Sequence, residues 1–330
     1  MVLLTKQLKQ FNSIAGSMRQ NNILPILSYL KFEDGKITKN NLESFVTMEA
    51  DFEGAALIDE KVLMSIVDLT DADEIEVLPN GTKVTLCHGG KKFNSHTDDI
   101  KNFPENILID GEEIEITQDV IADLKVISNF TMERENLPFT SCVFLGNGVM
   151  AANTGFIAAV KKTEIDYPEI ILEKNATSLI KSFNSIFFSQ NNTYQFFTNG
   201  SFKFGFIKKE TKYLNMSKFF EMIPKEGALK MDKYPLQQFC DICNSVCVGR
   251  VVLAEISGSK AIMKDPDQEN DQEIPLPVEL PYFSFNPTYM SKLLKSLPDD
   301  DLTFIKDERR YFVTGESGFI SLIMEAFNNK

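Results

Sequence analysis

Three stretches of this sequence share one pattern, in which a short apolar helix is followed by two strands around a tight turn. They are Leu63–Phe93 (LMSIVDLTDADEIEVLPNGTKVTLCHGGKKF), Leu179–Phe206 (LIKSFNSIFFSQNNTYQFFTNGSFKFGF) and Leu293–Leu322 (LLKSLPDDDLTFIKDERRYFVTGESGFISL). Their first residues are 179 − 63 = 116 and 293 − 179 = 114 positions apart. Since this period is much longer than a solenoid unit, each copy is expected to be a small domain with its own core.

A second landmark gives the same period. The helix expected to open each copy begins near Thr5, Thr117 and Asp232, at spacings of 117 − 5 = 112 and 232 − 117 = 115. The chain of 330 residues is therefore predicted to divide into domains at 1–110, 111–227 and 228–330. Each of them has the usual size of a domain.

Hydrophobic periodicity predicts the elements inside each copy. The first helix places Leu4, Leu8, Phe11 and Ile14 on one face, as a period of 3.6 requires. Asn80-Gly81 and Asn199-Gly200 are strong hairpin turns. The predicted elements include strands at 26–32, 37–39, 44–52, 74–78, 83–87, 194–197, 202–206, 302–306 and 311–314, and helices at 233–247 and 287–297. Two helices and about eight short strands per domain predict an α+β fold with helices packed on antiparallel sheets.

Composition bounds the class of protein. The chain is 43% hydrophobic and 25% charged, which is ordinary for a globular protein. No apolar run approaches the roughly 18 residues of a membrane span, and the first residues are too polar for a signal peptide. Five cysteines without a paired framework indicate a reducing cytosol, so a cytoplasmic location and no membrane partner are expected.

The net charge of −13 argues against a nucleic-acid partner unless the charge is unevenly spread. Acidic residues gather in expected strands and loops, at 71–74, 112–115, 265–273 and 299–301, whereas the polar faces of the expected helices carry mostly Lys, Ser and Gln. The simplest interpretation is that good helix formers cover solvated faces. Recurrence in all three copies favours a surface that faces phosphate groups. The candidate DNA-facing residues are Lys6, Lys9, Arg19, Lys61, Lys125, Lys174, Lys181, Lys233, Lys292 and Lys295.

Two patterns that suggest other chemistry are weak. Cys240, Cys243 and Cys247 have metal-like spacing, but on a helix they form an apolar core stripe and no nearby histidine completes a ligand set. Cys87 and His88 could form a nucleophile pair, but neighbours on a strand point to opposite faces. No glycine-rich phosphate loop occurs. No catalytic residue, metal or cofactor is therefore expected.

Four segments add a family resemblance. They are Ile23–Ile37 (ILPILSYLKFEDGKI), Lys91–Glu105 (KKFNSHTDDIKNFPE), Met222–Pro224 (MIP) and Leu322–Met324 (LIM). With the triple repeat, they resemble the bacterial sliding clamp, the beta subunit of DNA polymerase III. The resemblance implies that two chains close head to tail into a ring of six domains. Helices would line the hole, which holds double-stranded DNA without regard to sequence, and the acidic residues would lie outside it.

The resemblance also implies a pocket that binds short peptides of polymerase and clamp loader subunits. Its wall here would be Phe139, Gly155, Phe156, Ile157, Ala158, Pro224, Leu322 and Met324. The family's Asp-Gly-His-Arg-Leu run reads Thr154-Gly155-Phe156-Ile157-Ala158, so a different cognate peptide is expected. The simpler interpretation of Phe156 and Ile157 is ordinary core.

The function expected is that of a non-enzymatic DNA sliding clamp: a homodimer that encircles duplex DNA and tethers a replicative polymerase. The edge strand Lys91–Ser95 of the first domain would join the third domain of the second chain. An alternative is a divergent clamp-fold scaffold that binds proteins but does not encircle DNA. A hydrolase that uses Cys87 and His88 is a third class, which the strand geometry disfavours.

Overall fold

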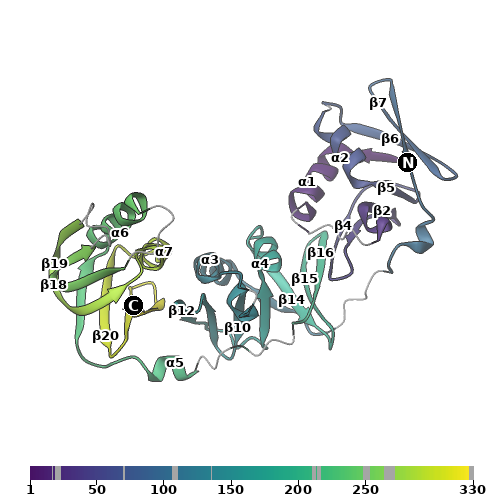
Figure 1. Cartoon of the computed structure of the whole chain (residues 1–330). Coiled ribbons are helices and arrows are strands. Elements are labelled where there is room, and N and C mark those ends of the chain that lie inside the picture. Colours follow the sequence, from purple (N-terminus) through teal and green to yellow (C-terminus); the bar gives the residue numbers. More distant parts are fainter. Residues whose placement is uncertain are drawn as a thin grey trace. The chain divides into compact units, whose positions relative to one another are not determined.

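The computed structural model describes residues 1–16, 18, 24–69, 71–105, 111–134, 136–209, 213, 217–247, 253–263 and 272–326. Within these residues one order of elements recurs along the chain (Figure 1). A strand and a helix come first, further strands follow, and a second helix precedes three strands. This order explains why the same sequence pattern appears three times.

The helices and turns have the following bounds. The α-helices are α1 (Thr5–Ala15), α2 (Glu60–Asp68), α3 (Gln118–Ile127), α4 (Lys174–Ile180), α5 (Ser217–Glu221), α6 (Tyr234–Val246) and α7 (Pro287–Ser296). The 3-10 turns are η1 (Pro25–Ser28), η2 (Ile100–Asn102), η3 (Ser128–Phe130) and η4 (Pro138–Ser141).

The strands follow the predicted hairpins closely. They are β1 (Val2–Leu4), β2 (Tyr29–Glu33), β3 (Lys36–Asn40), β4 (Ser44–Glu49), β5 (Ala56–Asp59), β6 (Glu74–Asn80), β7 (Lys83–His88), β8 (Lys91–His96), β9 (Ile114–Ile116), β10 (Cys142–Gly146), β11 (Val149–Asn153), β12 (Ile157–Lys162), β13 (Ile170–Glu173), β14 (Ile186–Gln190), β15 (Tyr194–Asn199), β16 (Phe202–Ile207), β17 (Ala228–Asp232), β18 (Ala254–Met263), β19 (Gln272–Phe285), β20 (Asp301–Asp307), β21 (Arg310–Thr314) and β22 (Ile320–Met324).

The chain forms two compact units. The first consists of residues 1–121 and 178–209, and the second of residues 122–177 and 210–330. The first unit contains an antiparallel sheet of order β1-β6-β7-β8 and an eight-stranded sheet of order β5-β2-β3-β4-β16-β15-β14-β9. The second unit contains an eight-stranded sheet of order β13-β10-β11-β12-β22-β21-β20-β17 and the hairpin β18-β19.

Strands from two sequence repeats share each large sheet. In the first unit β4 pairs with β16, so that Val46 lies opposite Phe204. In the second unit β12 pairs with β22, so that Ala158 lies opposite Leu322. We expected each repeat to enclose a separate core, but each large sheet is built from strands of two repeats. The division into three domains stays a prediction.

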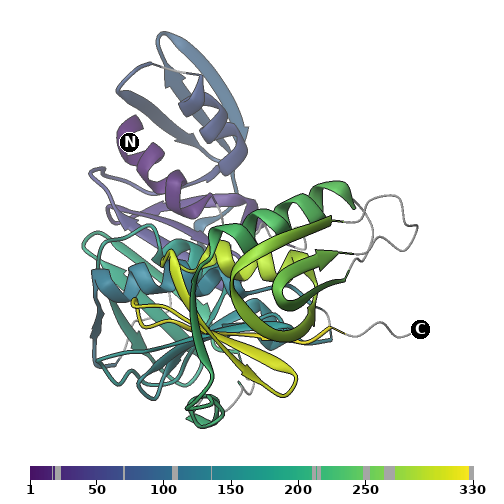
Figure 2. The same cartoon turned by 90° about the vertical axis from the view of Figure 1, so that its left-hand side faces the viewer.

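Side-chain hydrogen bonds to the backbone define where α2 and α7 begin. Asp59 caps α2, where its carboxylate accepts a hydrogen bond from the backbone N of Val62 at 3.0 Å. Asn286 caps α7 in the same way through the backbone N of Thr288 at 2.8 Å, and Pro287 occupies the first helical position. In Figure 2, α6 and α7 lie side by side and α6 runs along the β18–β19 hairpin, in accord with their packing contacts.

Three predicted segments differ from the structure. Residues 26–28 lie in η1 instead of a strand, because Pro25 begins a 3-10 turn there. The acidic segment expected to be a loop at 265–273 ends inside β19, at Gln272 and Glu273, and its other residues lie outside the described ones. The short apolar helix predicted at the start of the Leu179–Phe206 stretch extends only to Ile180, the last residue of α4, so Phe183 lies beyond it. In the part of the chain that is described, no helix is long and apolar enough to span a membrane.

Candidate functional site

The helices of the first unit present lysines to solvent. α1 buries Leu8, Phe11 and Ile14 and leaves Lys6 and Lys9 exposed on its other side. Lys61 is exposed on the first turn of α2. None of these three lysines has an ion-pair partner among the described residues, so their charges face solvent. Arg19 lies outside the described residues.

The other candidate lysines differ in exposure and in their ion-pair and hydrogen-bond partners. Lys125 is exposed in the last turn of α3, and Lys181 is half-buried just after α4. Lys174 Nζ lies 3.5 Å from Glu133 Oε1, and both side chains are well exposed. Lys295 Nζ lies 2.7 Å from Asp241 Oδ1, which neutralises part of its charge. Lys292 Nζ donates to the carbonyl of Thr131 at 2.9 Å, and burial lowers its pKa.

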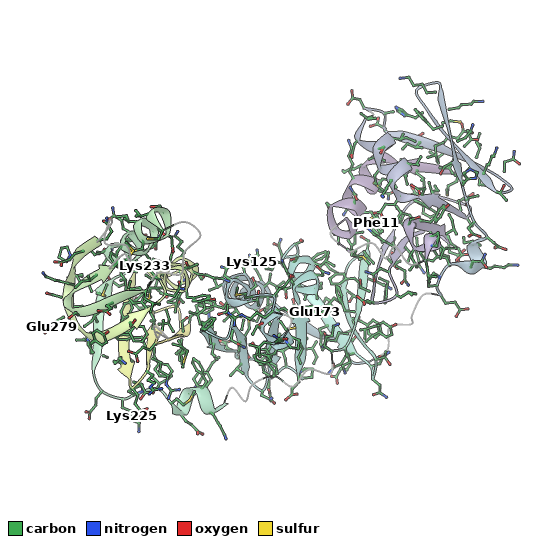
Figure 3. The ribbon with its side chains drawn as sticks, viewed as in Figure 1. Phe11, Lys125, Glu173, Lys225, Lys233 and Glu279 are labelled. Carbon is green, nitrogen blue, oxygen red and sulfur yellow. The ribbon has the colours of Figure 1, made fainter. Side chains whose placement is uncertain are left out.

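Lys233 corrects one expectation. Its side chain was expected on a polar helix face, but the residue is buried at 6% exposure and precedes the first turn of α6. Its Nζ donates to the carbonyl of Leu297 at 2.8 Å and lies 3.8 Å from Asp300 Oδ1. The ammonium group therefore ties α6 to the residues after α7 (Figure 3 labels it), and it does not face outward as a free charge.

The β12–β22 junction brings together most of the predicted peptide wall. Ile157 and Leu322 are buried, whereas Phe156 and Met324 are about two-fifths exposed. The backbone N of Met324 donates to the carbonyl of Phe156 at 3.0 Å. Phe156 is thus a surface residue, and Ile157 fits the ordinary-core interpretation.

Two wall residues lie further from this junction. Phe139 is half-buried on η4, which packs against β10 and β11. Pro224 is half-buried and follows Ile223, which packs on the apolar cluster that contains Leu322. The structure therefore places Gly155–Ala158, Leu322 and Met324 in one patch.

A tight turn at residues 154–157 places the Phe156 side chain on the surface. The Thr154 hydroxyl oxygen accepts from the backbone N of Phe156 at 3.3 Å and from that of Ile157 at 3.1 Å. Gly155 has φ +88°, a conformation that other residues rarely adopt. A Cβ atom at this position would also lie 3.4 Å from Arg134 Nη1. The backbone conformation is therefore what favours glycine here, since a contact of 3.4 Å with the end of a flexible side chain is ordinary.

Arg134 and Tyr289, which the sequence did not single out, complete the patch. The rings of Phe156 and Tyr289 have centroids 4.7 Å apart, and Arg134 Cζ lies 4.4 Å from the Phe156 centroid. Arg134 Nη2 donates to the Tyr289 hydroxyl oxygen at 3.2 Å. We call Arg134, Phe156 and Tyr289 the arginine corner. The signal that could have found it is weak, because the chain has five arginines and another of them, Arg310, lies opposite the wall residue Met324 in the β21–β22 pair.

A second surface lies beside β8 in the first unit. β8 is an edge strand of its sheet. A pocket of about 720 Å³ opens between α2 and this strand, and Lys61, Leu69, Lys91 and Phe93 are among its lining residues. Leu69 is 88% exposed and Phe93 is 39% exposed, which is unusual for side chains of this size.

The cysteines have the surroundings of core residues. Cys240, Cys243 and Cys247 are buried, as their helical spacing predicts. Burial is the largest cause that raises the pKa of the Cys240 thiol, and it raises that of Cys243 to about 12. Among the described residues no group of three or more His, Cys, Asp or Glu side chains could hold a metal ion.

Comparison with known proteins identifies the fold. No family model and no curated sequence matches the chain. A putative DNA polymerase III beta subunit from Eubacterium rectale is 13% identical over 98% of both chains, with a TM-score of 0.83. The Helicobacter pylori beta clamp, solved with a DNA ligase peptide, is 13% identical over 99% of this chain and all of its own, with a TM-score of 0.82. A sliding clamp from Bartonella birtlesii, solved with griselimycin, is 16% identical over 99% of both chains, with a TM-score of 0.84. The chain therefore has the clamp fold, and the predicted α+β class is confirmed.

Proposed function

We propose that this chain is a DNA sliding clamp, a non-enzymatic protein that closes around duplex DNA as a homodimer and tethers a replicative DNA polymerase. The observation that carries the proposal is the end-to-end match to beta clamps, which covers 98% or more of both chains in three solved structures. A shared fold alone does not fix a function. The proposal also rests on the charges and surfaces of this chain.

The exposed lysines of α1, α2 and α3 suit DNA that must slide. Lysine is a mobile point charge, so it attracts phosphate groups without reading bases. A closed ring holds DNA topologically, and strong phosphate contacts would slow its movement. Lys6, Lys9 and Lys61 of the first unit, which have no ion-pair partner among the described residues, and Lys125 of the second supply a weak attraction in a chain of net charge −13.

The edge of β8 is the proposed contact with the second chain. Its backbone groups on one side have no strand partner among the described residues, and Lys91 and Lys92 are exposed on it. β18 in the second unit also pairs on one side only, with β19, and it carries Glu255. Antiparallel pairing of β8 with β18 of a second copy would cover both edges and place opposite charges together.

The patch around Phe156 and Met324 is the proposed peptide groove. The Helicobacter pylori relative was solved with a DNA ligase peptide. An exposed aromatic ring, an exposed methionine and buried Leu322 beneath them suit the apolar anchors of an extended peptide. We propose that polymerase and clamp loader subunits bind here through such peptides.

The dimer is the first test of this proposal. Sedimentation equilibrium should give twice the chain mass of 37.3 kDa. Phe93→Asp should shift the protein to the monomer, because it puts a charge on the β8 edge that would join the second chain. Phe187→Asp is a matched control, since Phe187 is 41% exposed on β14 in the same unit. A parent protein that stays monomeric at tens of micromolar would favour the alternative of a scaffold that does not encircle DNA.

A further inference from the structure

The pocket between α2 and β8 contains three basic side chains beside apolar ones. Lys61, His88 and Lys91 are the basic residues of its lining. Leu69 and Phe93, both exposed, line the same space of about 720 Å³. Among the described lining residues there is no Asp or Glu. A surface of this kind fits a partner that brings carboxylates and apolar side chains together.

The two histidines of the chain lie on opposite faces of the β7–β8 hairpin. His88 ends β7, two residues after the buried Leu86, so its side chain shares the face that turns towards α2. It lies opposite Lys91 of β8. His96 ends β8 opposite Lys83, which is an odd number of residues from His88 and therefore on the other face. His88 lines the pocket and His96 does not.

The carboxylates of the neighbouring elements do not line this pocket. Glu74 and Glu76 are exposed on the outer face of β6, because the residues that alternate with them are buried. Asp59 caps the start of α2, and Asp68 ends that helix outside the lining. The charges that line the pocket with His88 are therefore those of the two lysines, and a proton on the imidazole adds to them.

The β18–β19 hairpin of a second copy has the complementary charge. Its two strands carry three glutamates and one lysine. Lys260 Nζ lies 2.6 Å from Glu273 Oε1, which leaves Glu255 and Glu279 outside that ion pair. The proposed ring already brings β18 of a second copy to the edge of β8, so the acidic hairpin would adjoin the basic pocket without a further interface.

We propose that His88 makes closure of the ring depend on pH: its protonation adds a positive charge to the α2–β8 pocket and strengthens the contact with the acidic hairpin of the second copy. This inference rests on the proposed function, because it assumes that two copies meet at β8. Histidine is the side chain that ordinarily changes charge between pH 5 and pH 8. Because the contact favours the imidazolium, the dimer takes up protons as it forms. The added affinity is therefore present at pH 6 and is lost as the pH rises to 8.

The dissociation constant of the dimer at pH 6 and at pH 8, with the ionic strength held constant, tests the inference. Fluorescence-detected sedimentation of a dilution series measures it. The parent should dimerise roughly tenfold more tightly at pH 6, since a partly exposed ion pair contributes about threefold and a ring of two chains contains two such interfaces. In His88→Gln the two dissociation constants should nearly agree.

His96→Gln is the matched control. It removes a histidine from the same hairpin but from the face away from the pocket, so the tenfold difference should remain. The amino group of Met1, which donates to the carbonyl of Val77 on β6, is present in both variants and cannot separate them.

Two further variants keep the test decisive if loss of the imidazole disturbs the hairpin. His88→Lys carries a permanent charge, so its dimer should be as tight at pH 8 as that of the parent at pH 6. Glu255→Gln with Glu279→Gln leaves His88 in place but removes the carboxylates of the hairpin, and it should also lose the dependence on pH. A dependence that persists in this double variant overturns the assignment of the hairpin as the partner of the pocket.

The outcomes separate this inference from the proposed ring. A parent dimer that is equally tight at both pH values, or a dependence that persists in His88→Gln, overturns the role of His88 and leaves the dimer intact. A parent that stays monomeric at both pH values contradicts the proposed ring, and the inference fails with it.

Discussion

Lys39 and Glu60 form an ion pair inside the first unit. Lys39 Nζ lies 2.7 Å from Glu60 Oε1 and donates to the carbonyl of Ala15 at 3.0 Å. Both residues are at least 93% buried. The pair connects β3, α2 and the end of α1, so removing either partner breaks a charge pair inside a dry site.

We expect Lys39→Met and Glu60→Leu each to lower the free energy of unfolding by about 3–5 kcal/mol. Urea titration followed by circular dichroism measures the change. The double variant should lose less than either single variant, because it buries no unpaired charge. Additive losses would contradict this account of the pair.

The cysteines allow a second test at the residue scale. The raised pKa of Cys240 and of Cys243, about 12 for the latter, keeps these thiols protonated at pH 8, where only thiolates react quickly. Cys142 and Cys247 are also buried, whereas Cys87 is partly exposed. Ellman's reagent should therefore titrate one thiol in the native protein and five in urea, and Cys87→Ser should abolish the native reaction. Rapid reaction of a second native thiol would refute the assigned burial.

At the scale of elements, we predict that the helix faces with exposed lysines contact DNA. Changing Lys6, Lys9 and Lys125 to Gln should weaken DNA binding equally on different sequences. The slope of log K against log salt should fall by up to about 3 for each chain, since each lysine that contacts a phosphate contributes about one. Filter binding at several salt concentrations measures both.

A matched variant controls for net charge in that experiment. Lys36, Lys203 and Lys225 are exposed on strands and a loop, and changing them to Gln removes the same charge. This variant should retain the parent's salt slope. If both triple variants behave alike, DNA is attracted by overall charge and the helix faces have no special role.

The peptide groove gives a prediction for the β12–β22 junction. Phe156→Ala with Met324→Ala should abolish peptide binding, because exposed aromatic and methionine anchors dominate such sites. The β12–β22 hydrogen bonds use backbone groups and should survive, so the melting temperature should change little. Calorimetric titration with apolar hexapeptides gives the affinity, and undiminished binding would place the partner site elsewhere.

Sequence periodicity predicted most of the helices and the hairpins joined by Asn-Gly, because these signals are local. It missed β1, which has three residues and is too short to show a period, and β17, where only one of five residues is buried. It also gave no strand for β19, where Pro275, Pro277 and Pro281 lack the backbone donor of a regular ladder. β18 shows register shifts around Gly258, which accommodate an irregular partner.

The candidate site was only partly predictable, because sequence signals are local and some contacts of the site join distant parts of the chain. Phe156 and Met324 came from the family resemblance, and the structure places them together. Arg134 and Tyr289 are 155 positions apart and meet where α7 packs against η3 and the residues that follow it. A single sequence carries no signal for such a long-range contact. Lys233 was misplaced because a helical pattern cannot show that a lysine at the helix start bends inward to a carbonyl.

At the scale of the whole molecule, the proposed ring lets an acidic protein hold DNA. In the proposed clamp, attraction would come from a few helix faces, and retention would come from ring closure instead of affinity. Binding that depends on closure has a property that surface binding lacks: a closed ring can leave the DNA only by sliding off a free end. The expected homodimer and the function of the clamp can thus be tested together.

Retention on linear duplex DNA with blocked ends tests this claim most directly. One end carries biotin bound to streptavidin on a bead, the ring threads from the free end, and an antibody against a terminal digoxigenin then blocks that end. In high salt, which removes phosphate contacts, the protein should stay only on DNA blocked at both ends. Cleavage of the DNA by a restriction enzyme should release it. Equal loss from blocked and unblocked DNA would contradict encirclement.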